Sequence, residues 1–319
     1  KMDMYQKRKI RAEKKNNDSQ KSFSKVSISW YPGHMAKTKK QIIEDLKLID
    51  IVVEILDARI PLASQNPDVK EYTKGKRKIM VLNKSDLADE KETKKWIKYF
   101  NKQGVSAVIT DANAGKGIND VITEIKRISR ENQEKYINKG RIGKSVRVLI
   151  LGIPNVGKSS FINRITKKST AKVGNKPGVT RQKQWIRLAE GIELMDTPGV
   201  LWPKFESNEI AHNLAFTGTI KDDILEKVEI AYELLKYLIE NYEENIIERY
   251  KLDKQEIDSI MEKDIEENDK IYTIMQIIAK KRGAILSGGR IDDEKISGII
   301  LDEFRSGKLG KITLEKANI

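Results

Sequence analysis

One stretch constrains the fold of this chain more than any other. An apolar run, Leu149-Ile150-Leu151, is followed by Gly152-Ile153-Pro154-Asn155-Val156-Gly157-Lys158-Ser159-Ser160. Two glycines bracket four residues and a Lys-Ser pair follows, which is the spacing of a phosphate-binding loop between a strand and a helix. The glycines permit backbone angles that a Cβ would block, and the helix N-terminus adds its dipole to the anion site. The stretch therefore predicts a nucleotide-binding P-loop.

Each part of this loop has an expected role. Backbone N–H groups wrap the α- and β-phosphates, Lys158 reaches the β- and γ-phosphates, and the Ser159 hydroxyl is a ligand of Mg²⁺. The phosphate-binding residues predicted here are Asn155, Val156, Gly157, Lys158, Ser159 and Ser160.

Composition excludes several other kinds of site. The chain has 319 residues, no cysteine and two histidines, and 39% of its residues are hydrophobic. We therefore expect about two domains, no disulfide partner, no thiolate zinc site and little scope for a histidine-based metal site. No apolar run approaches the length of a membrane span, so we expect a cytoplasmic protein without a membrane partner.

The net charge of +14 is unevenly distributed. Residues 1–48 hold 13 Lys/Arg against 5 Asp/Glu, and residues 49–204 hold 31 against 17. Residues 205–269 reverse the balance, with 7 Lys/Arg against 19 Asp/Glu. The basic parts suit a polyanion, and nucleic acid is the expected partner. The alternative is an ordinary solvated surface in a protein from a lysine-rich proteome.

The hydrophobic pattern predicts an α/β region followed by helices. Buried-strand patterns occupy 50–56, 78–82, 105–110 and 193–195, besides the run before the P-loop, and polar, helix-like sequence follows the first two. A basic amphipathic helix precedes them, between Met35 and Ile49. Residues 205–319 are mainly helical by periodicity: a long helix is expected over 224–246, another over 271–281, and a third from about Asp293 to Gly307.

A base-recognition motif follows the second predicted strand. In Asn83-Lys84-Ser85-Asp86, the Asp86 carboxylate can accept hydrogen bonds from guanine N1–H and the N2 amine, which adenine does not offer. Asn83 braces the loop, and the stem of Lys84 covers the ring. Alone, this tetrapeptide also fits an ordinary Asx-type turn; together with a P-loop it predicts guanine specificity.

Two later motifs predict the parts that sense the γ-phosphate. Asp196-Thr197-Pro198-Gly199 ends a predicted strand, so that Asp196 holds Mg²⁺ and the Gly199 N–H contacts the γ-phosphate. Thr180, within Pro177-Gly178-Val179-Thr180-Arg181, is expected to supply a second Mg²⁺ contact when the γ-phosphate is present. An ordinary loop threonine is the alternative.

These motifs occur in an unusual order. The guanine motif precedes the P-loop, whereas a conventional GTPase begins with the phosphate loop and ends with the base loops. The chain therefore resembles a circularly permuted GTPase, and within that class the ribosome biogenesis GTPase A family of large-subunit assembly factors. The motifs that carry this resemblance are Trp-Tyr-Pro-Gly-His-Met-Ala-Lys at 30–37, Asn-Lys-Ser-Asp at 83–86, Gly-Ile-Pro-Asn-Val-Gly-Lys-Ser at 152–159, Pro-Gly-Val-Thr at 177–180, Asp-Thr-Pro-Gly at 196–199 and Ala-Lys-Lys-Arg-Gly at 279–283.

The resemblance implies a domain organisation and a partner. Residues 1–27 are lysine-rich and poor in apolar residues, so composition predicts a basic, flexible arm, which is additional to the family pattern. The resemblance implies a circularly permuted GTPase domain at 28–204 with a mostly parallel sheet, and a helical domain at 205–319 that binds RNA. The expected partner is a late precursor of the large ribosomal subunit and its rRNA. A zinc-containing small-subunit GTPase is disfavoured by the absence of cysteine.

Further residue roles come from likeness to GTPases. The loop from Asp111 to Gly117 resembles a guanine-contacting loop in which Asp111 replaces the usual serine, so that the Ala112 N–H is expected to contact guanine O6. Val200 stands where many GTPases have a water-orienting glutamine, and the family resemblance points to His34 instead. A structural role for His34 is the alternative. Asn155 matches GTPases that recruit K⁺.

Six basic residues of the C-terminal region could form one RNA-binding surface: Lys280, Lys281, Arg282, Arg290, Arg305 and Lys308. Solvated helix ends favoured by the helix dipole are the alternative. The expected ligands of the whole protein are GTP or GDP, Mg²⁺ and possible K⁺. Other functions stay open: a P-loop ATPase or kinase, a nucleotide-gated RNA-binding module in which hydrolysis is incidental, and a GTPase that acts on another RNA particle.

Overall fold

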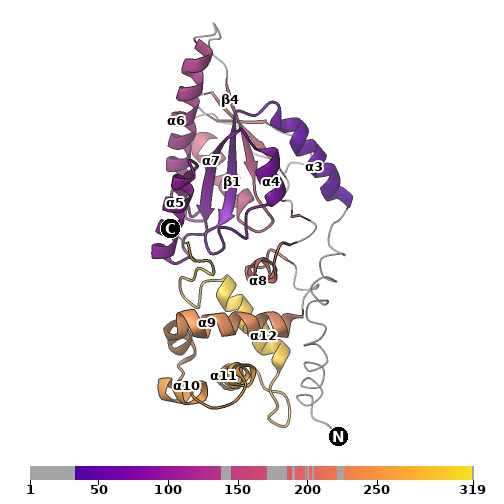
Figure 1. The fold of residues 1–319 in the computed structure, drawn as a ribbon, viewed down its shortest axis with the longest axis vertical. Coiled ribbons are helices and arrows are strands. Elements are labelled where there is room, and N and C mark those ends of the chain that lie inside the picture. The colour runs from indigo at the N-terminus through magenta and orange to yellow at the C-terminus, as the bar shows by residue number, and fades with distance from the viewer. Residues whose placement is uncertain are drawn as a thin grey trace.

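The protein is built around a mixed sheet, seen here in a computed structural model (Figure 1). The structure describes residues 33–137, 145–170, 185–188, 191–197, 199, 201–202, 205–220 and 226–317, so the predicted arm at 1–27 lies outside it. Six strands lie in the order β3-β2-β1-β4-β6-β5, and all pair in parallel except β5, which is antiparallel to β6. Their bounds are β1 Ile51–Asp57, β2 Arg77–Asn83, β3 Ser106–Ile109, β4 Val146–Leu151, β5 Trp185–Leu188 and β6 Ile192–Asp196.

Helices cover both faces of this sheet, as a parallel sheet requires. Every residue of β1 is buried. On one face, side chains such as Val52 and Leu149 pack with α3 (Gly33–Leu46) and α4 (Pro67–Tyr72), and Leu82 packs with α5 (Glu90–Lys102). On the other face, α6 (Ile118–Ile137) and α7 (Lys158–Thr170) bury their apolar sides. The predicted α/β fold is confirmed.

Local sequence explains where several helices begin. Asp89 accepts hydrogen bonds from the backbone N–H groups of Lys91 and Glu92, which satisfies two free donors in the first turn of α5. Asn66 caps α4 in the same way, and Pro67 occupies its first helical position. The helix starts are therefore fixed by the residues that follow β1 and β2.

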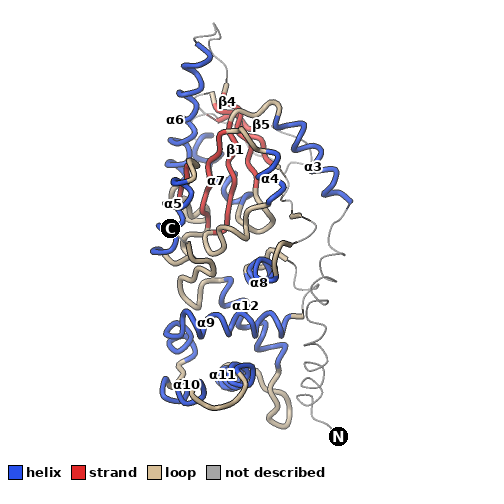
Figure 2. The backbone as a smooth tube through the Cα atoms, in the orientation of Figure 1, coloured by secondary structure: helices blue, strands red, loops and turns tan. Residues whose placement is uncertain are grey.

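The C-terminal region consists of helices, as Figure 2 shows. The helices are α8 Asn208–Phe216, α9 Lys227–Tyr250, α10 Lys254–Met261, α11 Glu267–Lys281 and α12 Asp293–Arg305. Ala231, Leu234 and Leu238 of the predicted long helix lie on the buried side of α9, which kinks at Tyr242. The helix begins at Lys227, and the predicted start at 224 lies outside the described residues. No helix in the described residues is long and apolar enough to cross a membrane.

The chain ends by returning to the sheet-containing part (Figure 1). We call residues 309–315 the C-terminal strap. The Ile312 N–H donates to Leu87 O at 2.9 Å, and the Leu314 N–H donates to Arg59 O at 2.8 Å. On the helical side, the hydroxyls of Tyr242 and Tyr237 donate to the carbonyls of Thr313 and Leu314, each at 2.9 Å. The strap therefore joins α9 to the loops that follow β1 and β2. The predicted domain boundary at 204/205 stays a prediction.

Candidate nucleotide-binding site

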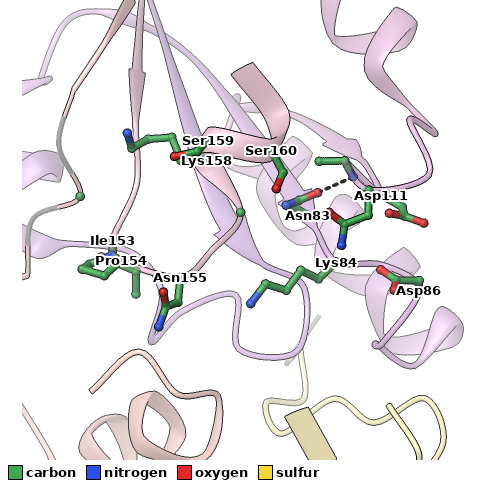
Figure 3. A pocket seen from close by; sticks show the side chains of 14 residues that line it. Asn83, Lys84, Asp86, Asp111, Ile153, Pro154, Asn155, Lys158, Ser159 and Ser160 are labelled. Atoms are coloured by element: carbon green, nitrogen blue, oxygen red, sulfur yellow. Dashed lines mark hydrogen bonds between the residues drawn. The ribbon is translucent and has the colours of Figure 1, made fainter. Parts of the chain in front are cut away.

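The predicted site residues meet at the edge of the sheet where the parallel strands end. A cavity of about 410 Å³ lies there, and ligands of open α/β sheets bind at this edge. Its walls come from the loops after β2, β3, β4 and β6 (Figure 3). The lining residues are Asn83, Lys84, Asp86, Asp111, Ala112, Asn113, Ile153, Pro154, Asn155, Gly157, Lys158, Ser159, Ser160 and Gly199.

Asn83 connects the guanine loops to the P-loop. Its Nδ2 donates to Val156 O at 2.8 Å, while its Oδ1 accepts from the Thr110 hydroxyl and from the Ala112 N–H, both at 3.0 Å. A Cβ on Gly157 would lie 2.4 Å from Asn83 Nδ2, and Gly157 has a φ of +89°, so this position requires glycine. One buried amide thus fixes three loops.

The guanine side of the cavity contains two neighbouring carboxylates. Burial, reinforced by the charge of Asp111, raises the pKa of Asp86. Asp111 accepts a hydrogen bond from the Ala114 N–H at 3.0 Å, so the residue that replaces the usual serine closes its own loop. Arg164 of α7 donates to the carbonyls of Ala112 and Asn113 and holds that loop against the P-loop helix.

The phosphate side contains a charged pair between the P-loop and β6. Lys158 Nζ lies 2.6 Å from Asp196 Oδ1 and also donates to the carbonyl of Thr197. Lys158 begins α7, so the N-terminus of that helix faces the cavity. A Cβ on Gly199 would lie 3.0 Å from Pro154 N, so the chain after β6 passes close to the P-loop.

The oxygen donors here fit a magnesium ion. Ser159 lines the cavity, whereas Asp196 does not line it but pairs with Lys158, which does, and its side chain is 40% exposed. Hydroxyl and carboxylate oxygens are ligands that Mg²⁺ accepts. Within the described residues there is no cluster of three or more His, Asp or Glu that could hold a metal. A sparse protein donor set suits Mg²⁺, which usually completes its shell with water and substrate phosphate.

Comparison with known proteins identifies the family. A curated protein of Bacillus cereus named "Ribosome biogenesis GTPase A" is 44% identical over 288 residues, which is 90% of this chain and 93% of that protein. This chain belongs to the ribosome biogenesis GTPase A family. A family model described as "50S ribosome-binding GTPase" matches residues 147–279 of this GTPase, and one described as "RsgA GTPase" matches residues 69–206.

Solved structures share the fold of this GTPase. A GDP-bound structure of YlqF has a TM-score of 0.62 at 28% identity and covers 86% of this chain and 98% of its own. A GNP-bound YlqF from T. maritima has a TM-score of 0.60 at the same identity, covering 88% and 98%. Guanine-nucleotide binding, a P-loop and the circularly permuted order of motifs are therefore properties of this GTPase.

Some predicted site residues lie away from the cavity or outside the described residues. Val156 does not line the cavity, because its side chain is buried and its carbonyl accepts from Asn83. Thr180 lies outside the described residues, as does the side chain of His34, whose backbone is in the first turn of α3. Asn155, the K⁺ candidate, has a φ of 63° and donates from Nδ2 to the carbonyl of Gly218.

The six basic C-terminal residues differ in their surroundings. Arg282 pairs with Glu303, Lys281 donates to the carbonyl of Lys251, and Arg305 donates to the carbonyls of Phe216 and Ala215. Lys280, Arg290 and Lys308 complete the predicted set. RNA binding by these residues stays a prediction.

Sequence reasoning missed several residues that support the cavity. Arg164 holds the Ala112 loop, and Glu315 of the C-terminal strap accepts from the backbone N–H groups of Leu62 and Ala63 at 2.6 and 2.9 Å. Asp57 and Arg59 form a buried pair behind Lys84. The sequence did contain one signal, since Asp57 and Arg59 are charged residues at the end of an apolar strand.

Proposed function

We propose that this GTPase is an assembly factor that binds a late precursor of the large ribosomal subunit in its GTP state and leaves after hydrolysis. The names of the curated relatives and the family description "50S ribosome-binding GTPase" support this proposal. The observation that carries it is the convergence of guanine loops and P-loop on one cavity, at the edge to which the strap attaches the helical region. The helical region is the part proposed to contact rRNA.

In the proposed complex, each residue of the cavity has one task. Asp86 accepts from the guanine N1–H and N2 amine. The Ala112 N–H, which donates to Asn83 Oδ1 at 3.0 Å in this structure, would share that bond with O6 or exchange it for O6 when the base is bound. Lys158, with the P-loop N–H groups from Asn155 to Ser160, holds the phosphates, while the Gly199 N–H faces the γ-phosphate. Ser159, Asp196 and Thr180 would hold Mg²⁺, which supplies compensation of the charge on the phosphate oxygens.

Hydrolysis requires a group that orients the attacking water. Val200 has no polar side chain, so we propose that His34 takes this role when the ribosomal partner is bound. An enzyme without that group in place is expected to turn over at roughly 10⁻⁴ to 10⁻² per second. A His34→Ala variant should keep its GTP affinity and lose stimulated turnover; full stimulated turnover would contradict this assignment.

Potassium is the second proposed activator. A cation next to Asn155 would offset the negative charge that develops on the phosphates. Turnover should therefore be faster in K⁺ than in Na⁺ at equal ionic strength, and equal rates would contradict the proposal.

The decisive experiment measures steady-state GTP hydrolysis in K⁺ buffer with purified large subunits, with small subunits as the control. Stimulation by large subunits alone supports the proposed partner. Tight GTP binding without stimulation by either particle would favour the other candidate, a nucleotide-gated RNA-binding module or a GTPase of another RNA particle. The uneven charge of the chain favours an RNA partner in both cases.

A further inference from the structure

The carboxylate of Asp57 lies behind the guanine side of the cavity, and no nucleotide motif accounts for it. Asp57 is 1% exposed at the end of β1, directly opposite Asn83 in the parallel register of β1 and β2. Burial alone would raise the pKa of Asp57, but Arg59 and Lys84 together hold it well below its usual range. A buried charge is tolerated when it is paired in this way.

Four hydrogen-bond donors surround the Asp57 carboxylate, and they come from two residues. Arg59 supplies three of them: its backbone N–H and Nε reach Oδ1 at 3.1 and 3.0 Å, and Nη2 reaches Oδ2 at 2.8 Å. The fourth is Nζ of Lys84, at 3.0 Å from Oδ2. Arg59 therefore fixes the carboxylate, and the same carboxylate holds the end of the Lys84 side chain.

Lys84 is suited to be held at this place. Its backbone has a φ of 59°, which a residue with a side chain adopts infrequently, and its side chain is 21% exposed along the wall of the cavity. Figure 3 shows this side chain extending from the Asp86 side of the cavity toward Asn155. A flexible four-carbon stem loses rotamer freedom when it is fixed, and a fixed stem is already placed for a ligand.

Arg59 is itself fixed by the C-terminal region. Its guanidinium lies 5.2 Å from the ring centroid of Phe304 in α12, and its carbonyl accepts from the Leu314 N–H of the strap. The position of Asp57 is therefore determined from both the sheet and the helical region.

We propose that Asp57 is a positioning residue of the guanine site, which anchors Nζ of Lys84 so that the stem of Lys84 stays over the plane of the base. This inference rests on the proposed guanine site. The alternative is that Asp57 and Arg59 only stabilise the loop after β1. If Asp57 positions Lys84, loss of the Asp57 carboxylate weakens nucleotide binding only while Lys84 is present. If Asp57 only stabilises the loop, its loss weakens binding whether or not Lys84 is present.

A double-mutant cycle separates them. The affinity of fluorescent GDP is measured for Asp57→Asn, Lys84→Met and the double variant. Loss of a charged hydrogen bond predicts about tenfold weaker binding for each single variant. If Asp57 acts through Lys84, the double variant binds no more weakly than Lys84→Met; multiplied losses would overturn the inference.

Ser64→Ala provides a matched control in the same loop. The Ser64 hydroxyl accepts from the Asp57 N–H at 3.1 Å and donates to Ile60 O at 2.7 Å, so this variant loosens the loop without changing the carboxylate. We expect Ser64→Ala and Lys84→Met to weaken GDP binding independently, so that the loss in their double variant is the product of the two single losses.

Binding of inosine diphosphate tests whether a substitution has damaged the loop that carries Asp86. Inosine lacks the N2 amine, so the ratio of its affinity to that of GDP depends on Asp86. Asp57→Asn should leave this ratio unchanged within about twofold while weakening both ligands, because Asp86 still has both of its hydrogen-bond acceptors. A collapse of the ratio would mean that the whole loop had moved, which overturns the inference.

Failure of the inference is distinct from failure of the proposed site. If Lys84→Met binds GDP normally, the guanine site assigned to this cavity is wrong. If Lys84→Met is weakened while Asp57→Asn is normal, only the inference fails.

Acetylation of the unmodified protein offers a test that does not depend on folding of Asp57→Asn. In the GDP complex, Lys84 should react about tenfold more slowly than Lys94, which pairs with Glu90 on the exposed face of α5. Equal rates would overturn the inference.

Discussion

The guanine side and the phosphate side of the cavity are held in different ways. On the guanine side, Asn83 makes three buried hydrogen bonds and Asp57 is surrounded by cationic partners. On the phosphate side, the described contacts centre on the pair between Lys158 and Asp196, whose carboxylate is 40% exposed. The guanine base is the same before and after hydrolysis, whereas the γ-phosphate is lost. A rigid base site beside a less constrained phosphate site suits a nucleotide switch.

The substitution expected to break this contrast most strongly is Lys158→Met. It removes the cation proposed to bind the β- and γ-phosphates and leaves Asp196 without that partner. We expect about 100-fold weaker GTP binding and loss of turnover, since charge-assisted hydrogen bonds to phosphate are among the stronger polar contacts. Fluorescent-nucleotide titration and phosphate release measure the two effects.

Lys167→Met is the matched control, because Lys167 is an exposed lysine on the same helix. It should bind GTP as the parent protein does. Equal losses in the two variants would show that general positive charge, not the position of Lys158, attracts the nucleotide.

Asn83→Ala tests whether the guanine side is rigid because one amide connects its loops. The variant loses the bonds to Val156, Thr110 and Ala112, and leaves buried polar groups unsatisfied. We expect a loss of about 2 to 4 kcal/mol in the free energy of unfolding and at least tenfold weaker GDP binding. Denaturant titration and GDP titration check this, with the exposed Asn101→Ala as the control; a variant as stable as that control would contradict the proposed connection.

Local motifs account for the parts of the molecule that the sequence predicted. The P-loop and the guanine motif each lie within a few consecutive residues, and the apolar runs before them form β4 and β2. The positions of these residues around one cavity follow from parallel strands ending at one edge. Their roles in binding stay predictions. β5 was missed, because four residues at the edge of the sheet, of which only Leu188 is buried, give little hydrophobic pattern.

The supporting contacts were missed for a different reason. Glu315 contacts Leu62, which is 253 residues away in the sequence, and Asp57 contacts Lys84 across two neighbouring strands. A single sequence contains no periodicity that pairs such distant positions. The strap also has no helical or strand pattern of its own, so its attachment to the loops after β1 and β2 emerges only in three dimensions.

Glu315→Gln tests the buried carboxyl group by which the C-terminal strap contacts the loop after β1. Burial raises the pKa of Glu315 to about 7, although it accepts from Leu62, Ala63 and Asn213. Between pH 4.5 and 7 the folded protein therefore holds a proton that the unfolded chain has lost, so this group's contribution to stability falls as pH rises. We expect the free energy of unfolding of the variant, relative to the parent, to rise by about 2 to 3 kcal/mol across that window.

Denaturant titrations at several pH values measure this difference. Burial also raises the pKa of Glu54 to about 7, so the parent protein's pH dependence contains both groups and only the difference isolates Glu315. Glu244→Gln, at an exposed position of α9, is the control. Its free energy of unfolding should change with pH in the same way as that of the parent protein. A pH-independent difference for Glu315→Gln would mean that this carboxyl titrates normally.

We expect the smallest effect from Arg164→Met. Arg164 connects the guanine side of the cavity to the phosphate side. Arg164 projects from the P-loop helix, donates to Ala112 O at 3.2 Å and to the carbonyl of Asn113, and lies close to Gly115, where a Cβ would be 3.2 Å from Arg164 Cδ. Because the guanidinium is partly exposed and Asn83 also holds the Ala112 loop, we expect GDP dissociation to accelerate only about two- to threefold. Stopped-flow displacement measures this rate, with Lys167→Met as the control on the same helix. A loss as large as that of Asn83→Ala would mean that the guanine side depends on the P-loop helix for its rigidity, and the contrast between the two sides would then be wrong.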